Sequence, residues 1–153
     1  GKDVSLLRIG NARLYLALTK RGLYPNKSLT IRFPRVPDRM FRHFVRGYFD
    51  GDGCVHLEKI KRKSGNIRPR KLNIIFTSGS EKFLEDLSKE ISSKSAVKKQ
   101  NVIRAWTAYQ LRYSTLDSET LFHVMYNKVG KNEYLKRKHD IFIEHFKIKK
   151  KKA

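Results

Sequence analysis

The chain has 153 residues, and its 35 Lys and Arg against 14 Asp and Glu give a formal net charge of +21. This length accommodates one domain with its own core, and a hydrophobic content of 39% excludes a disordered tail. So much like charge opposes a compact state, so the composition points first to nucleic acid as a partner and second to a membrane surface, with a merely basic protein as the third interpretation.

The N-terminal third predicts a strand, a helix and a connector. The apolar residues within 4–9 are typical of a short strand, and Asn11 is a suitable N-cap for a helix ending near residue 21. Prolines then punctuate a connector, and Asp38 predicts the start of the next helix. Apolar residues cover more than half of that helix's circumference, which indicates burial by more than one neighbour.

From Gly53 onward the pattern alternates with a period of two, as in half-buried strands. We expect a hairpin with a basic loop over residues 59–70, a helix opened by Ser80, and a second hairpin over 96–100 and 107–114. Helices are expected over 117–128 and 134–147. The predicted order is αββαββαα with antiparallel hairpins, an α/β (α+β) fold.

Two segments of the chain resemble each other weakly. Residues 5–22 and 109–128 each contain a strand, ending Leu-Arg-Ile or Leu-Arg-Tyr, that runs into a helix. A lysine-bearing connector follows each, around Lys27 and around Lys136 to Lys138. Chance similarity is an alternative explanation at this length.

The segment RGYFDGDGCV (46–55) carries two closely spaced acids. Asp50 before Gly51 has an ordinary interpretation as a turn. Asp52 does not, because phosphate repels a carboxylate unless a divalent cation lies between them. Mg²⁺ is a suitable cation, since it binds through one or two carboxylates together with phosphate oxygens and water.

Residues 45–53 (VRGYFDGDG), preceded by FRHFV, resemble the LAGLIDADG motif of homing endonucleases. Four positions match the motif directly: Gly47, Asp50, Asp52 and Gly53. Arg46 departs from it, standing where the motif has Ala. The lead-in from residue 26 is similar to that of the second motif in two-motif members, so the resemblance covers nearly the whole chain. It implies the αββαββα fold of that family, with an antiparallel sheet forming a DNA-binding saddle.

The resemblance also implies roles for single residues. Gly47 would allow close packing against a second motif helix, and Asp50 would cap the end of its own helix. Asp52 would coordinate the metal at the scissile phosphate, with the Gly51 carbonyl as a further ligand. The implied cofactor is Mg²⁺, which Mn²⁺ or Ca²⁺ can replace in a crystal. Catalytic helpers would be Lys138, its counterpart Lys27 in the other half, and the polar Ser78.

Strand alternation predicts a second functional surface, the face of the sheet turned away from the helices. Two-stranded ribbons fit the DNA major groove, where Arg, Gln and Asn read base edges. For each of these residues alone, a solvated strand face is the alternative. The expected DNA-contacting residues are Cys54, His56, Glu58, Lys71, Asn73, Ile75, Lys98, Gln100, Gln110 and Arg112, with Arg62 in a loop that contacts phosphates.

The family requires two motif helices, and this sequence has one. We expect the other half to be either a missing first repeat of the same protein or a second copy in a homodimer. Arg46 favours the first, because a symmetric helix interface would bring two like charges together. On this interpretation residues 1–37 are the tail and linker of a first repeat, 38–147 the half-domain, and 148–153 a basic tail.

The function predicted from these features is site-specific cleavage of both strands of a long DNA target by metal-dependent phosphodiester hydrolysis. The alternative is a non-catalytic nucleic-acid-binding module, such as an RNA maturase or a regulator derived from the same fold. A single cysteine rules out an intrachain disulfide and predicts a reducing, intracellular compartment: cytoplasm, nucleoid or organelle matrix. No membrane association is expected.

Overall fold

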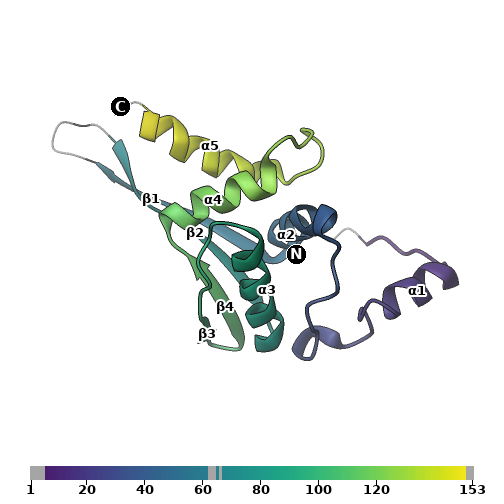
Figure 1. The fold of residues 1–153 in the computed structure, drawn as a ribbon. Coiled ribbons are helices and arrows are strands. Elements are labelled where there is room, and N and C mark those ends of the chain that lie inside the picture. The colour runs from purple at the N-terminus through teal and green to yellow at the C-terminus, as the bar shows by residue number, and fades with distance from the viewer. Residues whose placement is uncertain (1–5, 62–64, 66, 151–153) are drawn as a thin grey trace.

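The computed structural model describes residues 6–61, 65 and 67–150. The elements in chain order are α1 (Ala12–Thr19), η1 (Lys27–Leu29), α2 (Asp38–Asp52), β1 (Gly53–Lys61), β2 (Ile67–Ser78), α3 (Glu81–Lys94), β3 (Val102–Ala105), β4 (Ala108–Tyr113), α4 (Thr115–Tyr126) and α5 (Lys136–Lys150). From α2 onward the order is αββαββαα, so the predicted α+β architecture is confirmed (Figure 1).

The strands form one antiparallel sheet in the order β1-β2-β4-β3. Alternate side chains enter the core, as the period of two predicts. The buried strand residues are Val55, Leu72, Ile74, Phe76, Leu111 and Tyr113. Their neighbours in sequence point to the opposite face, so one face of the sheet is apolar and the other polar.

The helices of the half-domain pack on the apolar face. α5 contacts β1 and β2, α4 contacts β2, and α3 contacts β4 (Figure 1). α3 begins at the predicted residue, because the Ser80 side chain accepts a hydrogen bond of 3.3 Å from the Phe83 amide. The ring of Phe49 in α2 packs edge-on against Phe76 at 5.8 Å, which joins the motif helix to the sheet.

The second hairpin starts later than predicted. The expected strand over 96–100 is wrong, since β3 begins only at Val102. The preceding segment is instead bound to α3: Ser88 Oγ accepts from the Gln100 amide at 2.9 Å and donates to the Gln100 carbonyl at 2.8 Å. These bonds occupy the backbone groups that a strand ladder would need.

The N-terminal segment lies apart from the half-domain. Helix α1 projects away from the sheet and its covering helices (Figure 1). Its predicted cap is confirmed, because the Asn11 side chain accepts a hydrogen bond of 3.0 Å from the Leu14 amide. The strand predicted over 4–9 is wrong for residues 6–9, which are irregular, while residues 4 and 5 lie outside the described part.

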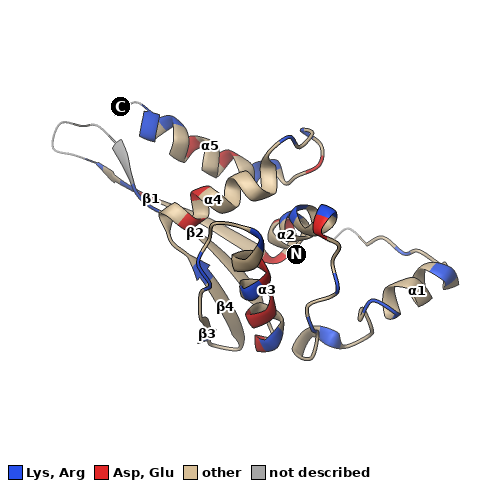
Figure 2. Cartoon of the chain, in the orientation of Figure 1, with Lys and Arg blue, Asp and Glu red and all other residues tan. Residues whose placement is uncertain are grey.

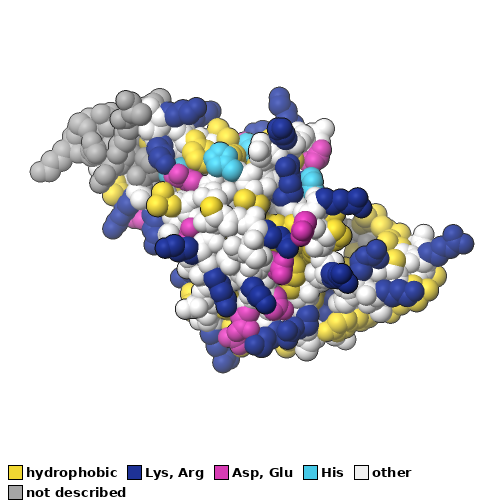
Figure 3. All heavy atoms as spheres, in the orientation of Figure 1, with side chains coloured by type: hydrophobic (Ala, Val, Ile, Leu, Met, Phe, Trp, Pro, Cys, Tyr) yellow, Lys and Arg dark blue, Asp and Glu magenta, His cyan; other side chains and the backbone are white. Residues whose placement is uncertain are grey.

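None of the residues of α1 is buried, although the segment around it is rich in large apolar side chains. Figure 3 shows hydrophobic side chains at the surface of this segment. The exposed set comprises Leu6, Leu7, Ile9, Leu14, Tyr15, Leu16, Leu18, Leu23, Tyr24 and Leu29. Such a large exposed apolar surface is unusual for a folded chain and indicates an interaction surface.

Basic residues are spread over the whole length of the chain, whereas acidic residues are most numerous on α3 (Figure 2). Within the described residues, no helix has the length and apolar character needed to cross a bilayer.

Candidate functional site

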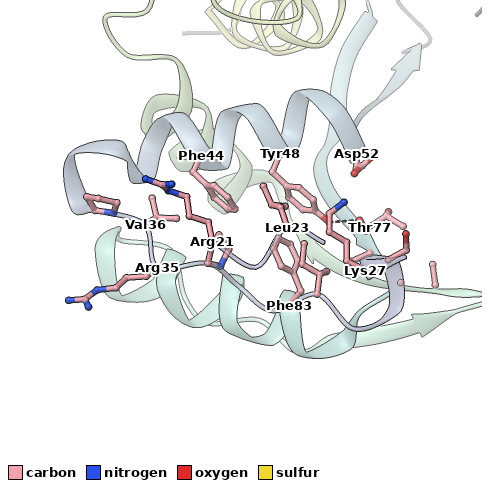
Figure 4. Close-up of a pocket in the computed structure, with 17 residues that line it drawn as sticks. Arg21, Leu23, Lys27, Arg35, Val36, Phe44, Tyr48, Asp52, Thr77 and Phe83 are labelled. Atoms are coloured by element: carbon pink, nitrogen blue, oxygen red, sulfur yellow. Dashed lines mark hydrogen bonds between the residues drawn. The ribbon is translucent and has the colours of Figure 1, made fainter. Parts of the chain in front are cut away.

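Asp52 is the last residue of α2, and β1 begins at the next residue without a loop. Its side chain is exposed and lines a cavity of about 740 Å³ between α2, the start of α3 and the connector that carries η1 (Figure 4). Lys27 and Ser78 line the same cavity. The structure therefore brings together three of the four residues predicted to be catalytic.

Lys27 reaches this cavity because the connector is anchored to the half-domain. The Ser80 hydroxyl donates a hydrogen bond of 2.7 Å to the Ile31 carbonyl. Gly79 packs so tightly on η1 that an added Cβ would lie 2.7 Å from the Ser28 carbonyl oxygen. In Figure 4 the Lys27 side chain extends from η1 toward the end of α2 that carries Asp52.

Tyr48 is a member of the site that the sequence did not single out. It lies one helical turn before Asp52 and donates a hydrogen bond of 2.6 Å to the Thr77 carbonyl, which fixes β2 against α2. Burial, together with the charge of Asp52, raises the pKa of Tyr48 to about 12 despite a hydrogen bond with Ser78. The hydroxyl is therefore protonated at neutral pH and acts as a donor.

Lys138 does not line the cavity, contrary to the role predicted for it. Its side chain is buried, and its Nζ donates hydrogen bonds to the carbonyls of Phe49, Asp50 and Gly53 at 2.6, 2.9 and 2.5 Å. Desolvation lowers the pKa of Lys138, and the nearby charge of Arg137 lowers it further. The sequence predicted correctly that this lysine lies near the C-terminal end of α2. The structure shows that it lies on the buried side of that helix end, away from the cavity.

Asp50 is structural, although it does not end the helix as predicted. α2 continues for two more residues. The Asp50 carboxylate accepts hydrogen bonds of 3.0 Å from the Tyr126 hydroxyl and the Leu135 amide, so it ties α2 to α4 and to the start of α5. Burial raises the pKa of Tyr126, and the charge of Asp50 raises it further.

Arg46 also points into its own half-domain, so the argument that it disfavours a symmetric dimer is wrong. The guanidinium is 6% exposed and donates to the carbonyls of Met125 and Glu133, both at 3.1 Å. It therefore fastens α2 to α4 and to the α4–α5 connector. No feature of the motif pattern signals this inward direction.

The opposite side of α2 is open. A Cβ added to Gly47 or Gly51 would meet nothing within 4 Å, and Met40 on this helix is 47% exposed. The two glycines stand four residues apart, so they share one helical face. This face carries small residues and is not covered by the described part of the chain. Both properties are required if Gly47 is to allow close packing against a second motif helix, as predicted.

The residues around Asp52 fit a divalent cation in part. The exposed carboxylate is a suitable oxygen ligand, and the open Gly51 backbone permits close approach to its carbonyl. Within the described residues no three His, Cys, Asp or Glu side chains cluster as a complete metal site. This half therefore offers one carboxylate, which suits a cation that takes its other ligands from elsewhere.

The outer face of the sheet brings together most of the predicted DNA-contacting residues. In the ladder Cys54 pairs with Ile75, His56 with Asn73, and Glu58 with Lys71. Arg112 pairs with Ile75 from the other side, and Gln110 pairs with Thr77. Paired residues share a face, so these side chains form one surface of mixed polarity. Thr77 belongs to it as well and was missed, although the alternation of β2 places it on the same face as Ile75.

Two polar contacts hold side chains on this surface. Glu58 forms an ion pair of 2.9 Å with Arg70, and Gln110 Oε1 accepts hydrogen bonds of 3.0 and 2.6 Å from Arg112. Lys98 and Gln100 do not lie on a strand, and Gln100 Nε2 donates to the Asp117 carboxylate at 3.3 Å on the helical side. Their predicted place on the sheet face is therefore wrong. Arg62 lies outside the described residues.

Comparisons with known proteins give one family and a few relatives. Residues 41–117 match the LAGLIDADG-like domain. A probable translation initiation factor IF-2 of Thermococcus kodakarensis is 39% identical over an alignment of 71 positions that covers 42% of this chain and 5% of that protein. The chain thus corresponds to only a small part of that relative.

Two crystal structures of the homing endonuclease I-CvuI are also similar, each with a TM-score of 0.49 and 12% identity, covering 74% of this chain and 68% of the other. One contains I-CvuI with the I-CreI target DNA, not cleaved, in the presence of 2 mM Mg. The other contains I-CvuI with its own target in the presence of 2 mM Ca.

Proposed function

Since this chain belongs to the family of LAGLIDADG-like domains, we propose that it is one half of a homing endonuclease, a site-specific, divalent-metal-dependent DNA endonuclease. The proposal rests on one observation above the others: the exposed carboxylate of Asp52 shares a cavity with Lys27 and Ser78 at the edge of the polar sheet face. A carboxylate in a chain of charge +21 is out of place beside phosphates unless a cation joins them.

Asp52 and the Gly51 carbonyl would hold the cation. When bound, the cation would lower the pKa of coordinated water and offset the negative charge that develops on the phosphate group during hydrolysis. Lys27 stabilises negative charge on the phosphate oxygens, because its ammonium enters the cavity from the side opposite α2. Tyr48 holds β2 against α2 and keeps Ser78 beside Asp52.

The outer sheet face would bind the DNA and set its register relative to Asp52. Arg112, Gln110 and Asn73 offer the donors and acceptors that read base edges in the major groove. Cys54 and Ile75 form an apolar row that can contact thymine methyl groups. Because β1 begins directly after Asp52, bases contacted by this strand lie close to the bond that is cut.

The enzyme would need a second half-domain of the same fold. Two surfaces of this chain support that requirement: the open Gly47 and Gly51 face of α2, and the apolar surface around α1. We expect the second half to cover both at once, since neither is covered by the described residues of this chain. A first repeat of the same protein accounts for both surfaces, and a second copy of this chain is the competing arrangement.

The test is cleavage of a library of long duplexes with Mg²⁺ by this chain together with its second half. Asp52→Asn should reduce cleavage by about a thousandfold or more, because the variant loses the charged metal ligand. Binding to the same duplexes in EDTA should change by less than about threefold. Asp86→Asn is the matched control, since Asp86 is a surface acid paired with Arg32 and does not line the Asp52 cavity.

Two results would contradict the proposal. One is binding without nicking by the wild type at every Mg²⁺ concentration tried, which would favour a non-catalytic binding module. The other is equal cleavage by wild type and Asp52→Asn, which would place the chemistry elsewhere. Sedimentation of the chain alone distinguishes the two assemblies: a stable dimer supports a second copy, and a monomer supports a first repeat.

A further inference from the structure

The end of the motif helix is closed by a side chain from a distant part of the chain. Lys138 stands in the first turn of α5, and its ammonium donates to the carbonyls of Phe49, Asp50 and Gly53. An ammonium has three N–H donors, so these contacts use all of them. The side chain is 3% exposed and its Nζ also lies 5.1 Å from the centre of the Phe49 ring.

This contact replaces the usual way of ending a helix. The last carbonyls of an α-helix lack partners within the helix, and a following glycine in the left-handed region commonly lets the next amides reach them. Gly53 is instead extended, with φ −82° and ψ 162°, because it is already the first residue of β1. The Gly53 amide still bonds the Phe49 carbonyl. The ammonium of Lys138 supplies a donor for the Asp50 carbonyl and a second one for the Phe49 carbonyl, and its positive charge suits a helix C-terminus.

The carbonyls that Lys138 holds lie on both sides of Asp52. Asp50 precedes it by two residues and Gly53 follows it directly. The Asp50 side chain is held as well, by the Leu135 amide at 3.0 Å, three residues before Lys138. The backbone that carries Asp52 is thus fixed by one short segment of α5 and its lead-in. The Gly51 carbonyl is not among the acceptors of Lys138.

We propose that Lys138 is a positioning residue: it fixes the peptide groups around Asp52, and so directs the Asp52 carboxylate and the Gly51 carbonyl toward a cation without itself touching the substrate. This inference rests on the proposed function for the identity of the ligand, and on the observed hydrogen bonds for the mechanism. A lysine acting directly on the phosphate would have to leave three carbonyls and its buried position.

The experiment uses the intact chain and compares Lys138→Met with Lys136→Met. Met keeps the length of the side chain and removes its charge and donors. Lys136 is the matched control, because it is exposed, lies two residues away and pairs with Asp140. Four quantities are measured for each variant. Two need no cleavage: hydrogen exchange of the amides of residues 50–55, and DNA affinity in EDTA. Two are measured with the second half present: the Mg²⁺ concentration for half-maximal cleavage, and turnover at saturating Mg²⁺.

In Lys138→Met we expect the amides of residues 50–55 to exchange about tenfold faster or more, since charged hydrogen bonds that close this turn are lost. The Mg²⁺ requirement should rise by about tenfold, with DNA affinity in EDTA and turnover at saturating Mg²⁺ nearly unchanged. Lys136→Met should leave all of these within about twofold of the wild type. A merely structural lysine would lower the amount of folded protein without changing the Mg²⁺ requirement of the folded fraction.

The proposal is overturned if Lys138→Met lowers turnover at saturating Mg²⁺ while exchange and Mg²⁺ requirement stay as in the wild type. That result would assign Lys138 a direct catalytic role. If Lys138→Met does not fold, Lys138→Arg answers the same question, because it keeps the charge while altering the donor geometry: its Mg²⁺ requirement must rise together with exchange at residues 50–55, and a change in turnover alone again overturns the proposal. The exchange measurement needs no cleavage, so a chain without nuclease activity would refute the proposed function and still report on Lys138.

Discussion

Helices α1 and α4 each follow a Leu-Arg-apolar sequence, yet one is exposed and the other is part of the core. α4 buries Ser118, Leu121, Met125 and Tyr126 against the sheet, and Ser118 Oγ accepts from the Ile74 amide at 3.0 Å. α1 buries none of its residues, although its sequence ARLYLALT is the more apolar of the two. The difference teaches that α1 has the apolar composition of a core helix but is not packed against a core within the described part of this chain. In the proposed assembly, the surface that covers α1 would belong to the second half-domain.

The largest effect is expected when one leucine in each of the two helices is truncated to alanine. Leu121→Ala should lower the free energy of unfolding by about 3 kcal/mol, because Leu121 is fully buried. Leu16→Ala should change it by less than about 0.5 kcal/mol, because Leu16 is 58% exposed. Urea denaturation of the two variants measures both values. Equal losses would mean that α1 packs on the half-domain in solution.

A second test compares two arginines that donate to helix carbonyls. Arg46→Met should destabilise the chain by about 2 kcal/mol, since it leaves the buried Met125 carbonyl without the Arg46 guanidinium. Arg21 donates to the Ala17 carbonyl at 2.9 Å in an exposed position, and Arg21→Met should have almost no effect. Thermal unfolding followed by circular dichroism measures the difference. A neutral Arg46→Met would show that Arg46 does not bind α2 to α4 as described.

The link between α4 and α5 predicts a pH dependence that α1 lacks. Glu119 accepts hydrogen bonds from His145 at 2.7 Å and from Lys149 at 2.9 and 2.7 Å. Burial alone would raise the pKa of Glu119, but the hydrogen bonds from Lys149 and His145 outweigh it and lower the pKa below its ordinary value.

Because the folded-state pKa of Glu119 is lowered, its contribution to stability is present above about pH 4.5 and is lost as the pH falls through the folded-state value. We expect Lys149→Met to lose about 1 kcal/mol at pH 7 and to show a smaller further loss on acidification than the wild type. Unfolding free energies measured from pH 7 to pH 3 test this. Parallel curves for the two proteins would contradict it.

The smallest expected effect on stability is that of deleting residues 1–23. The free energy of unfolding of the remaining chain should lie within about 0.5 kcal/mol of that of the full chain, because α1 contributes no buried residue to the half-domain. Association with the second half should be lost, since the apolar surface around α1 is removed. Denaturation measures the first effect and size-exclusion chromatography the second. A truncated chain that still assembles would show that α2 alone makes the interface.

The sequence predicted best those features that depend on local pattern. Period-two alternation located β1, β2 and β4, and the Asn11 and Ser80 caps were confirmed because a cap involves only neighbouring residues. These predictions needed no knowledge of which distant segments meet. Asp52 and Ser78, in contrast, were assigned from the family resemblance, and Lys27 was assigned from the internal repeat to the other half, so the sequence did not predict the cavity that all three line.

Three of the errors have one physical cause: a polar side chain that binds backbone groups of a distant segment. Arg46 and Lys138 were each assigned to a surface, but they donate to carbonyls of α4 and α2 respectively. Gln100 was assigned to the sheet face, but the Ser88 side chain of α3 binds its backbone. Backbone carbonyls are present at every residue, so a sequence carries no mark of which one a lysine or arginine will reach. Burial of these charged residues therefore appears only with the structure.

The junction at Gly53 couples the motif helix rigidly to the sheet. No residue separates α2 from β1, and a Cβ at Gly53 would lie 2.4 Å from the Phe49 ring. The turn of the chain from helix to strand is therefore tightly packed and has no loop that could absorb movement. Any rotation that a neighbouring helix imposes on α2 is transmitted directly to the strand that carries Cys54 and His56. In the proposed complex, a DNA site that fits the strand poorly would shift Asp52 from its position, so sequence recognition and the placement of this acid would be coupled at Gly53.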